Sequence, residues 1–198
     1  MIRVKDPGAS RETAEVYLPQ NLRLTYEDYC RMPSGHRYEL VEGDIRMTPS
    51  PSVFHQKVSG RLEKALRDWV ESRNLGEVYD SPIDVVLSEH NVVQPDILYI
   101  SSQRLGIIKE AYIRAIPDLV IEILSPSTAE WDRGTKRRLY VRYGVSELWL
   151  VDPESHSIEV AAYRGSEMID SRVFQCGSTL NSTILPGLTM DVDSLFRP

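Results

Sequence analysis

The amino-acid sequence predicts an α/β domain in which a mixed central β-sheet is flanked by helices. Segments rich in β-branched residues, typical of strands, lie between segments whose apolar residues recur at steps of three and four, typical of helices. The expected order is helix, hairpin, helix, three strands, helix and further strands, which favours an α/β sheet. The 198 residues, of which 41% are hydrophobic and 26% charged, suffice for one self-sufficient domain.

The chain is expected to begin with an arm and a short helix. Residues 1–21 lack helical and strand periodicity, so we expect an N-terminal arm there and a single domain over residues 22–198. Thr25 and Asp28 have the spacing of a capping-box variant and predict a helix over residues 25–32. A proline and a glycine directly after this segment end the helix.

A hairpin and a long helix are predicted next. Strand-like residues flank a Glu-Gly-Asp turn within residues 37–47, which indicates a hairpin. Ser52 is the expected N-cap of the long helix, and Asn74 with Gly76 end it. Its apolar residues have the spacing of one helical face and lie at Phe54, Val58, Leu62, Leu66 and Trp69.

Three strands and a second long helix should follow. Residues 77–87, 92–100 and 117–124 are rich in β-branched residues and bounded by turn residues, so each is predicted to form a strand. A helix over residues 129–143 comes next and ends at Gly144.

The C-terminal segment is predicted to complete the sheet. A strand over residues 147–152 precedes a hairpin whose arms are residues 157–164 and the segment around residues 168–174. Residues 183–196 are expected to hold a short strand and a helical turn.

Composition and hydropathy exclude several classes of protein. No apolar run approaches the roughly 18 residues of a membrane span, and the N-terminus lacks the apolar region of a secretory signal, so we expect a cytoplasmic protein without a membrane partner. Cys30 and Cys176 belong to no CxxC or Cys/His cluster, so we expect two reduced thiols and no zinc site. The net charge of −6 argues against broad electrostatic coating of nucleic acid but leaves local basic patches.

The sharpest chemical feature is a pair of carboxylates on separate predicted strands. Asp96 follows Pro95 at the start of one strand, and Glu122 interrupts the apolar run of residues 119–124. A buried ionised carboxylate costs several kcal/mol unless a cation compensates it, and a divalent metal or Lys136 would serve. Two acids and a lysine are the minimum set for metal-assisted phosphodiester hydrolysis. Spacing alone equally allows an inert arrangement, in which Glu122 pairs with an arginine and Asp96 caps a turn.

The order of these residues and their neighbours resembles the PD-(D/E)XK nuclease superfamily and, more closely, the restriction-endonuclease-like Uma family. The matching motifs cover much of the chain and lie at residues 38–45, His55, Pro95-Asp96, residues 121–127, residues 132–136, Tyr140 and residues 144–152. The superfamily pattern has a lysine two residues after the glutamate, where this chain has Leu124. The Uma-like pattern places the lysine on the next helix, which matches Lys136.

The resemblance implies a restriction-endonuclease-like fold with a Mg²⁺ (or Mn²⁺) site at one edge of the sheet. Asp96 and Glu122 would bind the metal, and the Ile123 carbonyl would add a ligand. Lys136 would act on the attacking water or on the phosphate.

Further residues would support this site by the same resemblance. Glu39 would line it, His55 would contact a metal-bound water or the phosphate, and Asp132 and Tyr140 would orient Lys136. The residues alone leave other roles open. Glu39 could equally be a hairpin charge that faces solvent, His55 a partner of a nearby loop, and Asp132 a charge favoured at a helix N-terminus.

The basic cluster on the second long helix is the best expected contact to a nucleic-acid backbone. We assign Arg133, Arg137 and Arg138 to that contact; the alternative, to which the residues alone give more weight, is that Arg137, Arg138 and Arg142 are the solvated face of an amphipathic helix. A homodimer is also expected, because cutting both strands of a duplex benefits from a twofold pair of sites, and the arm and C-terminal hairpin offer a route to exchange.

The function that the resemblance implies is Mg²⁺-dependent endonucleolytic hydrolysis of phosphodiester bonds in DNA. Two alternatives remain from the residues. One is a nucleic-acid-binding or regulatory module that retains the nuclease fold without turnover. The other is a structural or interaction protein whose acids are satisfied by arginines.

Overall fold

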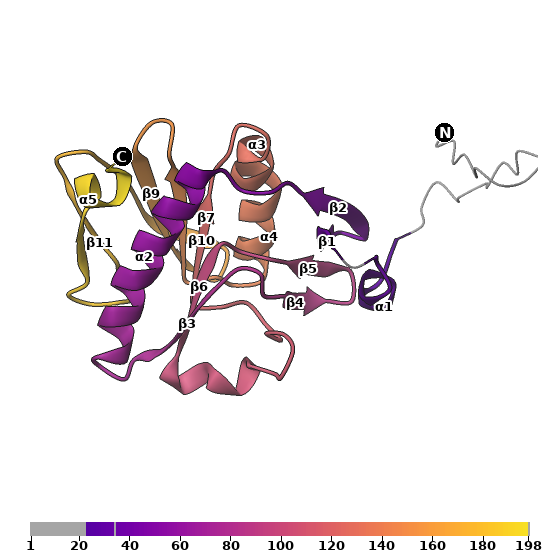
Figure 1. Cartoon of the computed structure of the whole chain (residues 1–198). Helices are drawn as coiled ribbons and strands as arrows, with labels where there is room; N and C mark the ends of the chain where they lie inside the picture. Colours follow the sequence, from indigo (N-terminus) through magenta and orange to yellow (C-terminus); the bar gives the residue numbers. More distant parts are fainter. Residues whose placement is uncertain (1–22, 34, 198) are drawn as a thin grey trace, which may run out of the picture.

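The structure, a computed structural model, describes residues 23–33 and 35–197 and consists of two main sheets and a small two-stranded one, with helices around them (Figure 1). The arm predicted for residues 1–21 lies outside the described residues. None of the helices in the described part of the chain has both the length and the apolar character needed to cross a membrane.

A six-stranded sheet forms the centre, with the strand order β10-β9-β8-β7-β6-β3. β7 and β8 pair in parallel and every other neighbouring pair is antiparallel, so the predicted mixed sheet is confirmed. Its strands are β3 (Gly76–Asp80), β6 (Ile97–Ser101), β7 (Leu119–Ile123), β8 (Glu147–Asp152), β9 (Ser157–Arg164) and β10 (Glu167–Gln175).

A four-stranded antiparallel sheet, ordered β2-β1-β5-β4, lies beside the central sheet. Its strands are β1 (Arg37–Val41), β2 (Asp44–Thr48), β4 (Val85–Ser88) and β5 (Asn91–Val93). The prediction of single strands over residues 77–87 and 92–100 is therefore wrong, because each segment is divided between the two sheets. Pro82 and Pro95 stand at the two divisions, and a proline has no N–H to continue a strand ladder.

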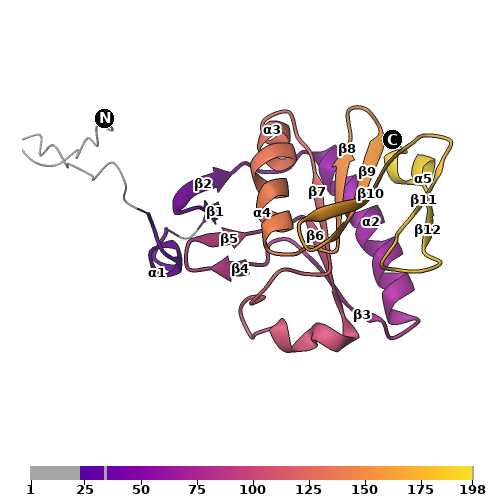
Figure 2. The ribbon, with the colours of Figure 1, turned by 180° about the vertical axis from the view of Figure 1, so that it is seen from behind.

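Two long helical segments cover opposite faces of the central sheet, as the views in Figures 1 and 2 show. α2 (Val53–Glu71) begins at Ser52, whose side chain accepts a hydrogen bond from the His55 N–H at 3.1 Å. The predicted helix over residues 129–143 is a continuous helical run in three parts. These parts are α3 (Ala129–Trp131), the π-helical turn η2 (Asp132–Lys136) and α4 (Arg137–Arg142).

Smaller elements complete the fold. The predicted N-terminal helix is α1 (Tyr26–Cys30), and its capping box is present. The predicted C-terminal strand and helical turn are β12 (Thr189–Asp191) and α5 (Val192–Phe196). Two elements were not predicted, the 3-10 helix η1 (Ser102–Ile107) and β11 (Thr179–Asn181), which pairs with β12.

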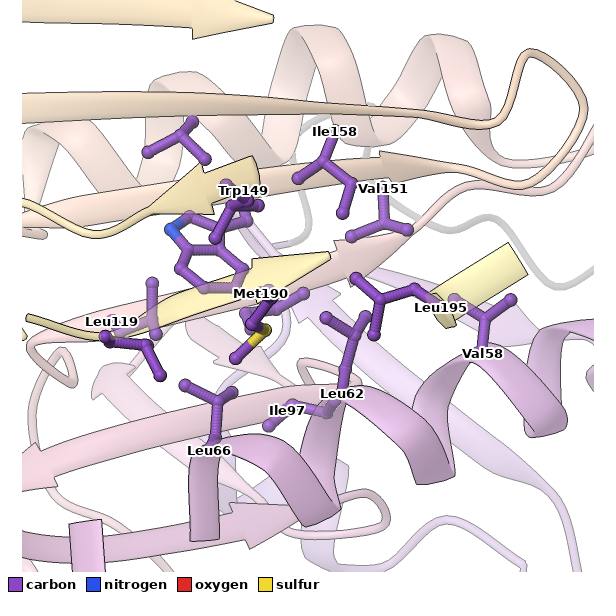
Figure 3. Close-up of a cluster of buried hydrophobic side chains, with 14 of the residues drawn as sticks. Val58, Leu62, Leu66, Ile97, Leu119, Trp149, Val151, Ile158, Met190 and Leu195 are labelled. Carbon is purple, nitrogen blue, oxygen red and sulfur yellow. The ribbon is translucent and has the colours of Figure 1, made fainter. Parts of the chain in front are cut away.

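Apolar side chains fill both faces of the central sheet. On one face α2 contributes Val58, Leu62 and Leu66, which lie against Leu119 and Trp149 of the sheet (Figure 3). On the other face α4 and the four-stranded sheet pack against alternate residues of the same strands. β7 is buried on both sides, which explains its nearly continuous apolar sequence. Side chains two residues apart on a strand point to the same face, and Val120 packs on the face covered by α4. The Glu122 side chain therefore points to the α4 face as well.

Candidate active site

Strand register brings Asp96 beside Glu122. β6 pairs with β7 so that Ile97 lies opposite Ile121, which places the residue before β6 next to the end of β7. The Ile123 N–H has no partner strand at this point and donates instead to Asp96 Oδ2 at 2.8 Å. The N–H and C=O of one strand residue point to the same side, so the Ile123 carbonyl also faces the space around Asp96.

The buried Glu122 carboxylate meets two side chains from the helical segment on its face of the sheet. Lys136 Nζ lies 2.7 Å from Glu122 Oε1, and the Tyr140 hydroxyl donates a hydrogen bond to the same oxygen. Lys136 and Tyr140 are four residues apart, so one helical face presents both. The cation that compensates Glu122 is thus a lysine and not an arginine.

The Lys136 ammonium also contacts two further acids. Its Nζ lies 2.9 Å from Glu39 Oε1 and 3.8 Å from Asp132 Oδ1. Glu39 comes from β1 of the four-stranded sheet, is buried, and accepts a hydrogen bond from the Gln94 N–H at 2.9 Å. The π-helical turn holds both Asp132 and Lys136 buried toward the sheet, and such turns are frequent at functional sites.

Burial and mutual attraction set the ionisation of this cluster. Burial opposes the charge on Lys136, but Glu122 and then Glu39 outweigh it and hold the pKa of Lys136 well above its usual range. Burial raises the pKa of Glu122, and Lys136 acts in the opposite direction. Burial likewise raises the pKa of Asp132 against the pull of Lys136. The lysine is therefore charged at neutral pH, and the carboxylates share its charge.

His55 joins the site from the first turn of α2. Its Nε2 lies 3.3 Å from Asp96 Oδ2, and the Ser52 cap fixes the backbone that presents it. Its Nδ1 is buried and has no hydrogen-bond partner among the described residues. A buried ring nitrogen without a partner is costly, which marks this position for a water, an ion or a substrate group.

All of these side chains except that of Tyr140 line one cavity of about 430 Å³. Its lining includes the acids, the lysine and the histidine predicted from the sequence, namely Glu39, Asp96, Glu122, Asp132, Lys136 and His55. The loops at residues 49–52 and 125–128 form further parts of the lining, together with Arg37, Arg46 and Trp131.

The donor atoms suit a magnesium ion. Within the described residues, the polar contacts of the Asp96 side chain go to Oδ2 and those of Glu122 go to Oε1, which leaves one oxygen of each for a ligand. No three His, Cys, Asp or Glu side chains of residues 23–33 and 35–197 form a ready-made metal cage. Mg²⁺ needs none, because it is commonly held by one or two carboxylates and keeps several of its waters.

The three arginines predicted to contact nucleic acid are not gathered at the cavity. Arg133 pairs with Asp152 at 3.0 Å, and Arg137 pairs with Glu159 at 2.8 Å. Arg138 is exposed, and its guanidinium donates to the Thr135 hydroxyl at 3.3 Å.

Sequence reasoning missed a cation–π pair between Arg46 and Trp131 at the cavity wall. The Arg46 guanidinium carbon lies 4.6 Å from the centre of the Trp131 ring, and both residues line the cavity. Arg37 also lines the cavity, and its Nε donates to the Gln94 side chain at 3.0 Å. Arg46 and Arg37 lie on strands of the other sheet, and no local pattern indicates that these strands reach the site.

Comparison with known proteins agrees with this fold. An uncharacterised protein of Synechocystis, slr1290, is 27% identical over 180 residues, covering 88% of this chain and 92% of the relative. The crystal structure of "a putative nuclease belonging to DUF820" from Anabaena variabilis superposes with a TM-score of 0.72 and 22% identity, covering 87% of this chain and 97% of the other.

At that level of identity the Anabaena structure establishes the fold, which is the one that the sequence predicts. The family itself is established by sequence. Residues 25–193, which include every residue of the candidate site, match the pattern of a family described as "Putative restriction endonuclease". The chain is a member of this family, Uma2.

Proposed function

We propose that this protein is a Mg²⁺-dependent endonuclease that hydrolyses phosphodiester bonds in DNA. The observation that supports this best is that Asp96, Glu122 and Lys136, which come from three separate segments of the chain, meet in one cavity. Membership of a family described as "Putative restriction endonuclease" favours DNA as the substrate.

In this proposal Asp96 and Glu122 hold the metal through their remaining oxygens, with the Ile123 carbonyl as a third ligand. When bound, Mg²⁺ would polarise the phosphoryl oxygen and lower the pKa of a coordinated water. Mn²⁺ is expected to replace it, because both ions accept oxygen ligands.

The electrostatics of the cluster explain why a cation is required. Three carboxylates, those of Glu39, Glu122 and Asp132, contact the single ammonium of Lys136, and a fourth, Asp96, lies near Glu122. The excess of negative charge repels a phosphodiester, so we expect substrate binding at this cavity to depend on a divalent cation that offsets most of this charge.

Lys136 has the position and charge to stabilise the reaction. A charged ammonium beside the metal-binding carboxylate can orient the attacking water or offset charge that builds on the phosphate. Its contacts with Glu39 and Glu122 hold it in place before substrate arrives, which removes reorganisation from the reacting step.

The approach to the cavity offers cations for the neighbouring phosphates. Arg46 and Trp131 line the cavity wall, and Arg138 lies on a second surface hollow that both of them share. A guanidinium beside an indole suits a nucleic-acid strand, because the first binds phosphate and the second stacks on bases. We propose that the scissile strand follows this surface, with Arg133 and Arg137 of the same helical run as additional phosphate contacts.

A second candidate function is that of a nucleic-acid-binding or regulatory module without turnover. The full engagement of Lys136 by its carboxylate neighbours favours it, because a lysine held in a closed ion-pair cluster has a structural role already. The two candidates differ in one observable, which is cleavage.

A cleavage assay on four substrates tests the proposal. Supercoiled plasmid, linear duplex, single-stranded DNA and RNA are incubated with the protein in Mg²⁺, in Mn²⁺ and in EDTA. We expect metal-dependent nicking or cutting of DNA by the parent and by Asp68→Asn, whose exposed carboxylate lies on α2. Asp96→Asn is expected to be inactive. Binding of DNA without cleavage in either metal would favour the regulatory module instead.

A further inference from the structure

β10 is an open edge of the central sheet. It pairs with β9 on one side, and no other strand of the described residues pairs with it. Three of the six exposed large hydrophobic side chains in the described chain lie on this strand. These are Met168, Ile169 and Val173, which are 48%, 50% and 62% exposed. Long edge strands with exposed apolar residues are normally covered or blunted, since they pair readily with other strands.

The sequence of β10 is complementary to itself when two copies run antiparallel. With Ser171 on the twofold axis, Asp170 lies opposite Arg172 of the other copy, and each pair occurs twice. Further out, the β-bulge at Ile169 shifts the pairing by one residue, so Met168 lies opposite Val173. Opposite charges and apolar residues that face each other across a strand pair both stabilise it.

Charge also selects this register over its neighbours. A twofold axis perpendicular to the sheet places each side chain of β10 on the same face in both copies. The register can therefore change only in steps of two residues, and each step moves the axis along the strand by one residue. Centring the pair on Asp170 would place that carboxylate opposite its own copy. Centring it on Arg172 would place two guanidinium groups together. Both alternatives set like charges opposite each other, which destabilises a strand pair.

We propose that this protein forms a symmetric dimer through antiparallel pairing of β10 with the β10 of a second copy, joining the two central sheets into one. The interface is isologous, as a twofold dimer requires. β9 and β8 separate β10 from β7, so the pairing is remote from the candidate active site. This inference does not depend on the proposed nuclease activity.

The shape of the edge agrees with a short pairing centred on Ser171. A β-bulge lies between Met168 and Asp170, where Ile169 is the extra residue relative to β9. From Asp170 to Gln175 the pairing with β9 is continuous, so the outer edge of this stretch is regular. Asp170 and Arg172 already pair within one copy at 2.8 Å and are partly exposed, so both can reach across the axis.

Charge exchange tests both the surface and its register. Asp170→Arg gives a strand with two arginines and Arg172→Asp gives one with two aspartates, so each variant alone should be monomeric. An equimolar mixture of the two should form a heterodimer, because each arginine then meets an aspartate. The double variant D170R/R172D restores opposite charges in one chain and should again form a homodimer.

Light scattering and sedimentation velocity of the full chain at micromolar concentration give the readout. The parent is expected at twice the 22.6 kDa of one chain. Val173→Lys should be monomeric, while Met47→Lys, an equally exposed apolar site on the edge of the other sheet, should stay dimeric. Thermal melts identify any variant that fails to fold.

Three results would overturn the proposal. The first is a monomeric parent. The second is a parent dimer that persists in both Val173→Lys and the single charge variants, since another surface would then hold it. The third is a mixture of folded D170R and R172D chains that remains monomeric.

Discussion

Replacing Lys136 with Met tests the electrostatic role of the buried ammonium. In the parent, the Lys136 ammonium lies 2.7 Å from the Glu122 carboxylate and 2.9 Å from that of Glu39. Met has a similar length and no charge, so the change leaves both carboxylates without their cation. Lys136 is 3% exposed, so water cannot take its place without rearrangement. Removing one partner of a buried ion pair typically costs about 3–5 kcal/mol. In a chain of this size, that loss lowers the melting temperature by roughly 6–20 °C.

The pH dependence of this loss separates electrostatics from packing. Burial raises the pKa of Glu122 even with Lys136 present, and removing the lysine raises it further. The folded state of the variant therefore binds more protons than the unfolded state, so its stability is greatest at low pH and is lost as pH rises through the folded pKa of Glu122. In the parent, folding raises the pKa of Lys136, so the charged lysine stabilises the folded state. This stabilisation is fully present below the pKa that the lysine has in the unfolded chain, and it is lost only at alkaline pH, as pH rises through the folded pKa.

Thermal melts of the parent and Lys136→Met between about pH 5 and pH 8 measure this effect. The difference in melting temperature should widen as pH rises. Lys64→Met removes an exposed lysine that pairs with Asp68 and should change the melting temperature far less. The reasoning is refuted if Lys136→Met melts with the parent, or if its deficit is the same at every pH.

Two further predictions concern parts of the chain away from the cavity. The Glu147 carboxylate is fully buried and accepts four hydrogen bonds, two of them from Thr183. Glu147→Ala leaves these donors unpaired and should lower the free energy of unfolding by at least about 3 kcal/mol in urea titrations, whereas an unchanged midpoint would show that the contact is dispensable. Cys30 and Cys176 are exposed and unpaired, so thiol titration of the denatured, unreduced protein should count two, and a count near zero would contradict this.

Local patterns predict an element correctly when the pattern of its own residues also indicates which of its faces is buried. The spacing of Val58, Leu62 and Leu66 indicates one helical face, and that face is buried in α2. The apolar run around Glu122 indicates a strand buried on both sides, and β7 is such a strand. The acid within that run requires compensation, which directs attention to the basic residues of the next helix, among them Lys136.

Tertiary placement is where sequence reasoning fails. Val92 and Ile97 lie in one apolar segment, yet β5 and β6 belong to different sheets. Propensity reports that a segment is extended but not which neighbour it will pair with. The same limit applies to Arg46, which reaches the cavity because β2 folds toward Trp131 and not because of any spacing along the chain.

For the self-complementary edge of β10, the pattern is local but its meaning depends on tertiary placement. Its pattern of Asp170, Ser171 and Arg172 is visible in the sequence, but it has meaning only once the strand is known to be an edge. The prediction of a homodimer stays a prediction until the molar mass is measured.

Calorimetric titration of Mn²⁺ into the parent and into Asp96→Asn tests the central claim most directly. Asp96 Oδ2 accepts a hydrogen bond from the Ile123 N–H and lies beside His55. Asparagine has the shape of aspartate and can keep these contacts, but it lacks the charge that the ion requires. We expect saturable binding of Mn²⁺ to the parent, with Mg²⁺ competing for the same site, and no measurable binding to a variant that folds as stably as the parent. Equal affinity of the two proteins for Mn²⁺, or an Asp96→Asn chain that melts several degrees lower in the absence of metal, would show that these carboxylates are structural and contradict the nuclease assignment.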